Sequence, residues 1–304
     1  MLKLSSRTLI TAAAALCCAS LAIAPAHAAE ATDSDPIIVT GQPVERLEQF
    51  VDRVSVASPM ADQLPRWDTS ICTSLAGLPR RQAEFVADRI ARRAMAVGVQ
   101  PGEPGCQANV SVIFTQNGDE VAQRMFEQDR QMFAYYQETN VSTLGQAAFN
   151  DTFLRSSAPV RWWHVSHTMT ADGLSLAGDA SQGGMSNAPV QRASGTRLRS
   201  ETREDLRRAI IIVDARRVGG VQLAALADYI SMVALAQVDP GANTSGFPSI
   251  LNLFAQSGGE PLTEMTVWDL AYLDGLYHTT RNAANAQQQE REIARRMSGA
   301  ETTP

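Results

Sequence analysis

Apolar residues recur along this chain with helical spacing in several segments and with strand-like spacing in others. The segment "PVERLEQFVDRV" predicts a helix whose apolar side carries Val44, Leu47, Phe50, Val51 and Val54. A second helix is predicted from Pro79 to Gly98, because proline is favoured just inside a helix start and glycine just past its end. A third is predicted over "GDEVAQRMFEQDRQMFAYYQ", residues 118–137.

Strands are predicted where β-branched and aromatic residues gather. They are "ANVSVIFT" at 108–115, "VRWWHVSHTMT" at 160–170 and "RAIIIVDA" at 208–215. The unbroken apolar run of the last predicts a central strand, buried on both faces. The glycine- and serine-rich run 173–195 between the second and third strands predicts a loop or loose hairpin.

The segment "GGVQLAALADYISMVALAQVD" is apolar around almost its whole circumference. Such a segment is either a central buried helix or a membrane span. Asp228 near its middle would cost about 2.5–3.5 kcal/mol in a bilayer, and Gly219 and Gly220 dilute its start, so the buried helix is favoured. A buried Asp228 needs a partner, and we expect an arginine or a backbone amide.

The C-terminal part predicts a helix over "LTEMTVWDLAYLDGLYHTTRN" with Thr263 as its cap, followed by a polar, frayed tail at 279–304. Residues 29–56 are expected to form an N-terminal strand and helix extension. The fold class is therefore α+β, with one globular domain at 57–278 that holds a mixed sheet, a central buried helix and a helical C-terminus.

The first residues, "MLKLSSRTLITAAAALCCASLAIAPAHAAE", combine basic residues, an apolar run and the small-x-small site Ala26-His27-Ala28. This pattern predicts a signal peptide at 1–28 and a periplasmic or secreted mature chain. The spacing around Cys17 and Cys18 differs from that of a lipoprotein box. Without the leader the chain holds 24 basic residues (26 − 2) against 32 acidic ones, a net charge near −8. That balance argues against nucleic acid as a partner.

Cys72 and Cys106 are the cysteines left after cleavage of the leader, and we expect them to form a disulfide in an oxidising compartment. The bridge would stabilise the fold by roughly 4 kcal/mol in the chain-entropy model. If residues 67–72 and 108–115 were parallel strands, we would expect the two cysteines at opposite edges of the sheet. The disulfide is favoured, and with it an antiparallel second strand. The alternative is a catalytic thiol.

Candidate catalytic groups are few. His164 and His167 sit three apart on a predicted strand and therefore face opposite sides, so neither a metal site nor a cofactor is predicted. Asp214 is the most interesting acid, because it ends the apolar strand; pairing with Arg216 or Arg217 is its structural alternative. A serine hydrolase set of Ser186, His164 and Asp179 can be drawn, although no Gly-x-Ser-x-Gly elbow occurs.

Two further features have both a binding and a structural interpretation. Gly219 and Gly220 precede a helix but lack the spacing of a nucleotide-binding loop. Trp162 and Trp163 form either a stacking surface for sugar or peptide, or one core ring and one ring that shields the opposite sheet face.

The segment "DPIIVTGQ", Asp35–Gln42, resembles the short strand that outer-membrane receptors offer to the energy-coupling protein TonB. Such a segment acts by adding a strand to its partner's sheet, so it must be extended and accessible. The interaction residues would be Ile37, Ile38, Val39 and Thr40. An ordinary edge strand of the chain's own domain is the favoured alternative.

The order of a strand, an apolar helix, "PSILNLF" and "LTEMTVWDLAYLDGLY" resembles the second half of zincin metallopeptidases. We align Ala234-Leu235-Ala236 with the residues that follow the second histidine of the zinc motif in that family. The positions of the family's zinc ligands and general base are then occupied by Tyr229, Ile230, Val233 and Asp239. None of these can replace the histidines and glutamate of the family, and Ile230 stands for the glutamate. The resemblance therefore implies a degenerate, non-catalytic relative of that scaffold.

The chain also resembles exported Gram-negative bacterial proteins of unknown function, through "DPIIVTGQ" and "LADYISMVALAQ…LNLF". The hypothesis that follows is an exported, soluble, non-catalytic domain that binds an unknown protein or peptide in the cell envelope. The alternatives are a hydrolase using Asp214, His164 or Ser186, and a TonB-docking envelope protein.

Overall fold

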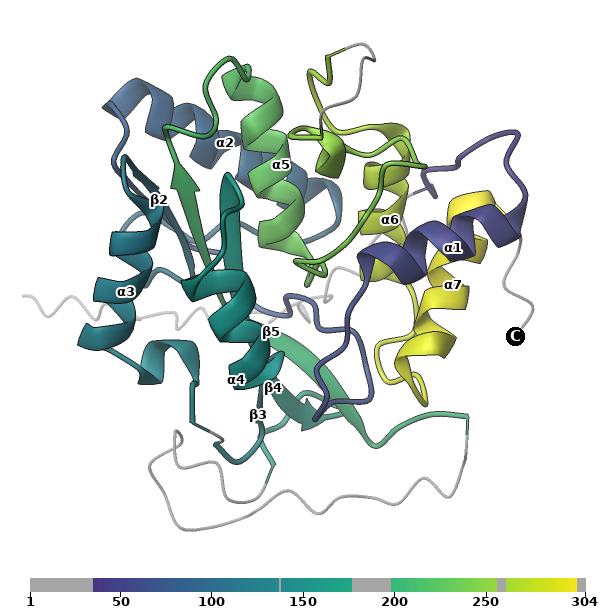
Figure 1. The fold of residues 1–304 in the computed structure, drawn as a ribbon. Coiled ribbons are helices and arrows are strands. Elements are labelled where there is room, and N and C mark those ends of the chain that lie inside the picture. The colour runs from purple at the N-terminus through teal and green to yellow at the C-terminus, as the bar shows by residue number, and fades with distance from the viewer. Residues whose placement is uncertain (1–34, 137, 177–197, 256–260, 300–304) are drawn as a thin grey trace, which may run out of the picture. The chain divides into compact units, whose positions relative to one another are not determined.

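The computed structural model describes residues 35–136, 138–176, 198–255 and 261–299, and these form an α+β domain around a five-stranded mixed sheet (Figure 1). The order of strands across the sheet is β1 (Thr73–Ala76), β2 (Val110–Thr115), β5 (Thr202–Asp214), β4 (Val160–Thr170) and β3 (Val141–Ser142). β1, β2 and β5 run parallel, whereas β4 is antiparallel to both β5 and β3. The predicted mixed sheet is confirmed.

β5 is the central strand, as its apolar run predicts. Residues 209–213 are buried, because β2 and β4 flank the strand and helices cover both of its faces. A bulge opposite Val165 and Ser166 interrupts the pairing with β4. Before the bulge, β5 pairs with Arg66 instead of β2, so the start of this strand departs from the parallel half of the sheet.

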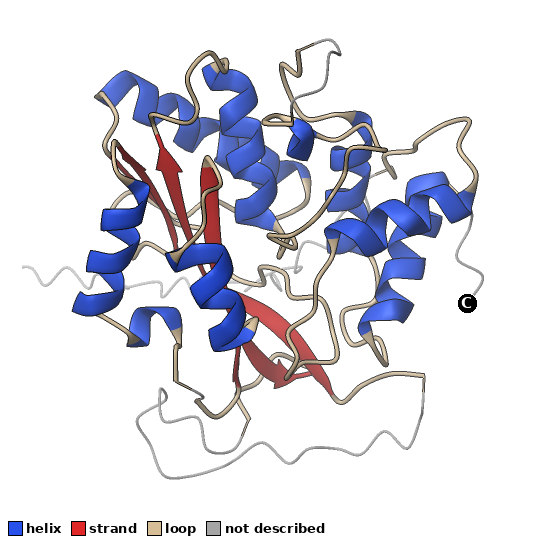
Figure 2. Ribbon diagram, in the orientation of Figure 1, coloured by secondary structure: helices blue, strands red, loops and turns tan. Residues whose placement is uncertain are grey.

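Each face of the sheet has its own hydrophobic core. The larger core lies under α2 (Arg80–Ala96), α5 (Leu223–Leu235) and α6 (Val267–His278) and includes Trp162 and Ile211. The smaller core lies under α3 (Gly118–Gln128), α4 (Gly145–Ala148) and the π-helical turn Phe149–Leu154, and it includes Trp163 and Ile210. Figure 2 shows the two helical layers on either side of the strands.

α5 is the predicted central buried helix. All of its residues from Ala225 to Leu235 are buried, including Asp228 and Ser231. Within the part of the chain that the structure describes, no helix has both the length and the apolar character needed to span a bilayer.

α6 begins later than predicted. Thr263 is not its cap; the side chain of Thr266 accepts a hydrogen bond from the Asp269 backbone, and the Asp269 carboxylate binds back to Thr266. This capping box needs an acidic residue three positions after the threonine, which Thr266 has and Thr263 lacks.

The two terminal segments pack against each other. α1 (Val44–Val54), the predicted N-terminal helix, contacts α7 (Ala286–Ser298), as Figure 1 shows. The prediction of a frayed tail is wrong for α7, because Ile293, Ala294 and Met297 provide an apolar side that is completely buried. Asn285 caps the start of this helix and Gly299 ends it in a left-handed conformation.

The predicted strand at residues 37–40 is absent. The Val39 amide donates to the carbonyl of Met297 at 2.7 Å, and the Val39 side chain is 5% exposed. Val39 is thus held by the C-terminal helix, and its amide bonds to that helix instead of to a strand. The predicted leader at 1–28 and residues 29–34 lie outside the described residues.

The disulfide between Cys72 and Cys106 is confirmed, with 6.0 Å between the Cα atoms. The antiparallel arrangement expected with it is wrong, since β1 and β2 are parallel. In the sequence, α2 lies between the two strands and runs back along the sheet. Both strands therefore start at the same end of the sheet. Cys72 immediately precedes β1 and Cys106 lies shortly before β2, which brings the cysteines together.

Two further boundaries differ from the predictions. The first strand is at 73–76 and not at 67–72. α3 ends at Gln128, because Asp129 adopts an extended conformation, and Ala134 is left-handed, so the predicted helix is broken well before its expected end.

Candidate functional site

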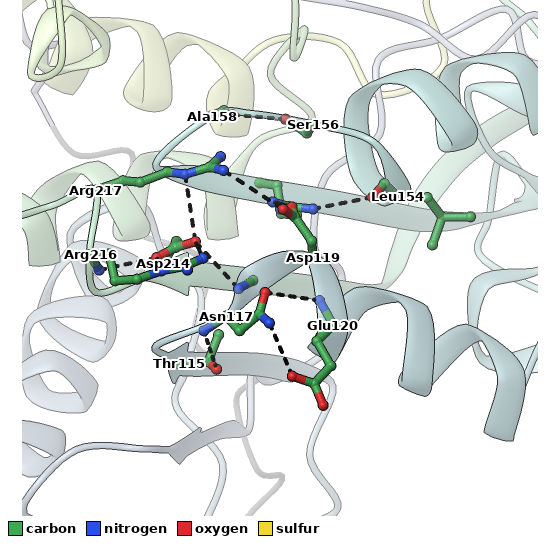
Figure 3. A network of polar contacts seen from close by, with 12 residues as sticks. Thr115, Asn117, Asp119, Glu120, Leu154, Ser156, Ala158, Asp214, Arg216 and Arg217 are labelled. Atoms are coloured by element: carbon green, nitrogen blue, oxygen red, sulfur yellow. Dashed lines mark hydrogen bonds and ion pairs between the residues drawn. The ribbon is translucent and has the colours of Figure 1, made fainter.

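Asp214 lies at the carboxyl end of β5, where Figure 3 shows it surrounded by donors. The Arg216 guanidinium donates to both carboxylate oxygens at 3.2 and 3.0 Å, and the Arg216 amide donates at 3.1 Å. The Gly118 amide, at the start of α3, donates at 3.4 Å. The hydrogen bonds from Arg216 lower the pKa of Asp214 to about 2, although burial acts in the opposite direction.

A second carboxylate completes this network. Asp119 lies 2.5 Å from the Arg161 guanidinium and 3.7 Å from that of Arg217, which also lies 3.6 Å from Asp214 (Figure 3). β2 is followed by α3 on one face of the sheet and β5 is followed by α5 on the other, an arrangement whose crevice often binds ligands. The side chains of the chain itself fill this position, so Asp214 has the structural role that pairing with Arg216 and Arg217 predicts.

His164 does not meet Asp214. Its Nε2 lies 2.7 Å from the carbonyl oxygen of Val233, and burial lowers its pKa to about 4, so the neutral ring donates to that carbonyl. His164 pairs in register with Ala209, which places Asp214 roughly 16 Å further along β5 at 3.3 Å per residue. These two groups of the hydrolase hypothesis cannot exchange a proton directly. Ser186 and Asp179 lie outside the described residues.

The positions linked to zinc by the zincin resemblance form part of the core or of a turn. Tyr229, Ile230 and Val233 are buried in α5, and Asp239 accepts a hydrogen bond from the Gly241 amide. Among residues 35–299, apart from the gaps named above, no three His, Cys, Asp or Glu side chains are grouped as a metal site requires.

Trp162 and Trp163 point to opposite faces of β4. The Trp162 ring donates to the Val238 carbonyl in the larger core, and the Trp163 ring donates to the Phe133 carbonyl in the smaller one. The interpretation of one ring on each face is confirmed, and an exposed stacking surface is excluded because both rings are buried.

The interaction residues expected for TonB docking are only partly accessible. Ile38 is 42% exposed, but Val39 is buried and its amide is already bonded to α7. In this structure the segment therefore lacks the free, extended backbone that strand addition needs.

An unpaired strand edge lies elsewhere, on β1. The Cys72 carbonyl accepts from the Val110 amide, so Cys72 faces β2, whereas the Ile71 amide and carbonyl face away and bond to Gln100 and Gly102. Alternate residues of a parallel strand face alternate sides, so Thr73 and Leu75 also face away from β2. Their outward amides and carbonyls have no backbone partner in the described part of the chain.

A cavity of about 470 Å³ opens beside this edge. We call it the β1 groove; its lining residues are Ile71–Ser74, Ala87, Asp88, Ala91, 101–106 and Ala108. One wall is thus the edge strand, the second is the outward side of α2, and the third is the loop that carries the disulfide. This volume lies within the range of small-ligand sites.

The loop wall has a constrained backbone. A Cβ atom on Gly102 would lie 2.8 Å from the Sγ of Cys106, so the close approach to the disulfide requires glycine. Gly105 has a φ of +87°, which side chains disfavour, while Pro101 and Pro104 restrict their own φ angles. Together with the disulfide, these residues hold the wall of the groove in place before any ligand binds.

The groove was missed at the level of sequence, although one signal was present. The run "PGEPGC" at 101–106 combines two turn-forming pairs with a cysteine, which marks a rigid loop. The position of this loop beside an edge strand depends on the order of the strands in the sheet. That order could not be predicted from the sequence.

Comparison with family models, with curated proteins and with solved structures finds no match to this chain. Interpretation of the groove therefore depends on its own geometry and chemistry.

Proposed function

We propose that this chain is an exported, non-catalytic domain that binds an extended peptide segment of a partner protein in the cell envelope. The segment would add a strand to the outer edge of β1. The observation that carries this proposal is the presence of the outward backbone groups of Thr73 and Leu75 beside a preformed groove. Main-chain hydrogen bonds give such complexes affinity, and the pockets beside the strand give them specificity.

Three features of the chain support a binding role. Gly102, Gly105 and the disulfide hold the groove open, so a peptide does not have to order the loop on binding. The disulfide is typical of an oxidising compartment, which agrees with the predicted leader. The buried ionisable groups at the end of β5 are used in ion pairs, and the described groups of the hydrolase alternative lie apart.

The proposal is tested by selecting peptides from a random library displayed on phage against the immobilised mature chain. Ala91→Trp fills the groove from α2, and Ala96→Trp places the same side chain at the exposed end of that helix as a control. Selected peptides should bind the wild type and the control alike. They should bind Ala91→Trp at least about tenfold more weakly, which is the loss expected from one or two hydrogen bonds.

A second variant, Thr73→Pro, removes one outward amide without filling the groove and should also weaken binding; proline is tolerated on edge strands. Hydrogen exchange provides a direct measurement, because the amides of Thr73 and Leu75 should become protected when a selected peptide binds. If no peptide is enriched, or if the enriched peptides bind Ala91→Trp as tightly as wild type, the proposal is wrong.

A further inference from the structure

We infer that the peptide recognised by the β1 groove carries a lysine or arginine at the position that faces α2, with small residues around it. This inference rests on the proposed function and specifies the chemistry of the partner. It depends on three properties of the groove, which are its charge, the size of its lining side chains and the direction of its walls.

The ionisable groups among the lining residues of the groove are both acidic. Asp88 on α2 and Glu103 on the loop are exposed, and neither carboxylate is in an ion pair with a described residue. Arg92, one turn further along α2, donates to the main-chain carbonyl of Asp88 and not to its carboxylate. Two carboxylates are therefore available to a cationic group that enters the groove.

The lining side chains are small where a peptide would lie. Ala87 and Ala91 face the groove from α2, and Gly102 and Ala108 line it from the loop side. Such walls let a peptide backbone approach β1 closely and leave room for a long, unbranched side chain. The methylene stem of lysine or arginine can cover alanine surface while its charged end reaches a carboxylate at the rim.

The direction of the walls sets the position of the basic residue. Side chains of an added strand alternate between the two faces of the sheet. Leu75 packs on the larger core, which lies on the α2 side, and Thr73 shares that side by alternation. Every second residue of the peptide therefore faces α2 and Asp88, and only these positions should require a basic side chain.

The charge of the whole chain acts in the same direction. The net charge near −8 that remains without the predicted leader favours the approach of a cationic segment from a distance, in addition to the local pairing. Long-range attraction and local pairing can be separated, because the first depends on total charge and the second on the position of each carboxylate.

The test uses the peptides selected from the random library. Lysine and arginine should be enriched at alternate positions relative to the unselected library. Replacing the enriched lysine by glutamine in a synthetic peptide should weaken binding about tenfold at low salt, and less at high salt, where exposed charges are screened. The pair Asp88→Asn and Glu103→Gln should bind the lysine and glutamine peptides equally.

A charge-matched control is provided by Glu45→Gln with Asp52→Asn, two exposed acids of α1 outside the groove. This variant should keep the preference for lysine, because it removes two negative charges from the chain without changing the residues that line the β1 groove. Two results would overturn this inference while the proposed function stands. The groove-binding peptides could show no enrichment of basic residues, or the double variant Asp88→Asn with Glu103→Gln could keep the preference for the lysine peptide. Failure to select any groove-binding peptide would overturn both.

Discussion

The two sides of α2 use charge in opposite ways. On the inner side, Arg93 donates two hydrogen bonds to the buried Asp228 carboxylate, at 2.9 and 2.8 Å, and Arg89 lies 3.4 Å away. The Met265 amide completes the set at 2.8 Å. On the outer side, Asp88 lines the β1 groove without an ion-pair partner among the described residues.

The difference shows how burial separates structural charges from charges that are available to a ligand. Asp228 is 0% exposed, and an unpaired carboxylate there would be costly, so its partners are built into the fold. Asp88 is exposed to solvent, and leaving it without a partner costs little. The comparison is therefore between a buried carboxylate of α5, which pairs with the inner side of α2, and an exposed carboxylate on the outer side of α2 itself.

The largest effect is expected from Asp228→Ala in α5, which removes the acceptor that the inner side of α2 pairs with. The substitution leaves two arginines and the Met265 amide without their acceptor, which should lower the free energy of unfolding by roughly 3–5 kcal/mol. Urea denaturation followed by circular dichroism measures the loss. Asp88→Ala on the outer side is the control and should change stability by no more than about 0.5 kcal/mol. Equal losses in the two variants would remove the distinction between the two sides.

The next effect is expected from the double variant Cys72→Ser and Cys106→Ser. The cysteines are separated by 34 positions. Loss of the cross-link should destabilise the fold by about 4 kcal/mol and free the loop wall of the groove. Thermal unfolding with and without a reducing agent checks this. The wild type should approach the variant on reduction, and the variant should not respond. An unchanged wild type under reducing conditions would show that the bridge contributes little.

A smaller effect is expected at Glu204, a buried carboxyl that, unlike Asp228, is bonded to hydroxyl groups. Ser166 donates to it at 2.8 Å and Thr168 also donates, and the side chain is 2% exposed. Burial raises its pKa from the usual 4.5 to about 7, with smaller contributions from Asp205 and Asp62. Glu204 therefore becomes neutral by taking up a proton as the pH falls below about 7.

The sign of its pH dependence follows from this raised pKa. The stabilisation is complete below the unfolded-state pKa near 4.5 and is lost as the pH rises through 7. Between pH 4 and pH 8 the wild type should lose about 3 kcal/mol that Glu204→Gln retains, measured by urea denaturation at each pH. Parallel pH profiles for the two proteins would contradict the raised pKa.

Most local elements could be predicted because their causes lie within short segments. The apolar side of residues 44–54, the proline and glycine at the ends of α2, and the apolar run of β5 each specify an element without reference to the rest of the chain. The pairing of Cys72 with Cys106 also followed, since two cysteines allow one intramolecular bridge. For the buried Asp228, an arginine or a backbone amide was predicted as the partner, but the sequence did not indicate which arginine or which amide.

Other features could not be predicted because distant segments compete for the same residues. Residues 37–40 have strand-forming side chains, but the Val39 amide bonds to a carbonyl of α7 instead of to a strand. Nothing in the local sequence indicates that this distant helix is the partner. Asp214 has the position of a catalytic acid at the end of a central strand, and only the fold shows that Arg216, Arg217 and the start of α3 satisfy it.

The candidate site belongs almost entirely to this second group. The helices and strands with strong periodicity and the disulfide could be predicted from the chain alone. The position of β1 at the edge of the sheet, next to the loop 101–106 and the alanines of α2, is a property of the fold. A strand carries amides and carbonyls on both of its sides. Whether those on the outer side are paired depends on which distant segments of the chain pack beside it.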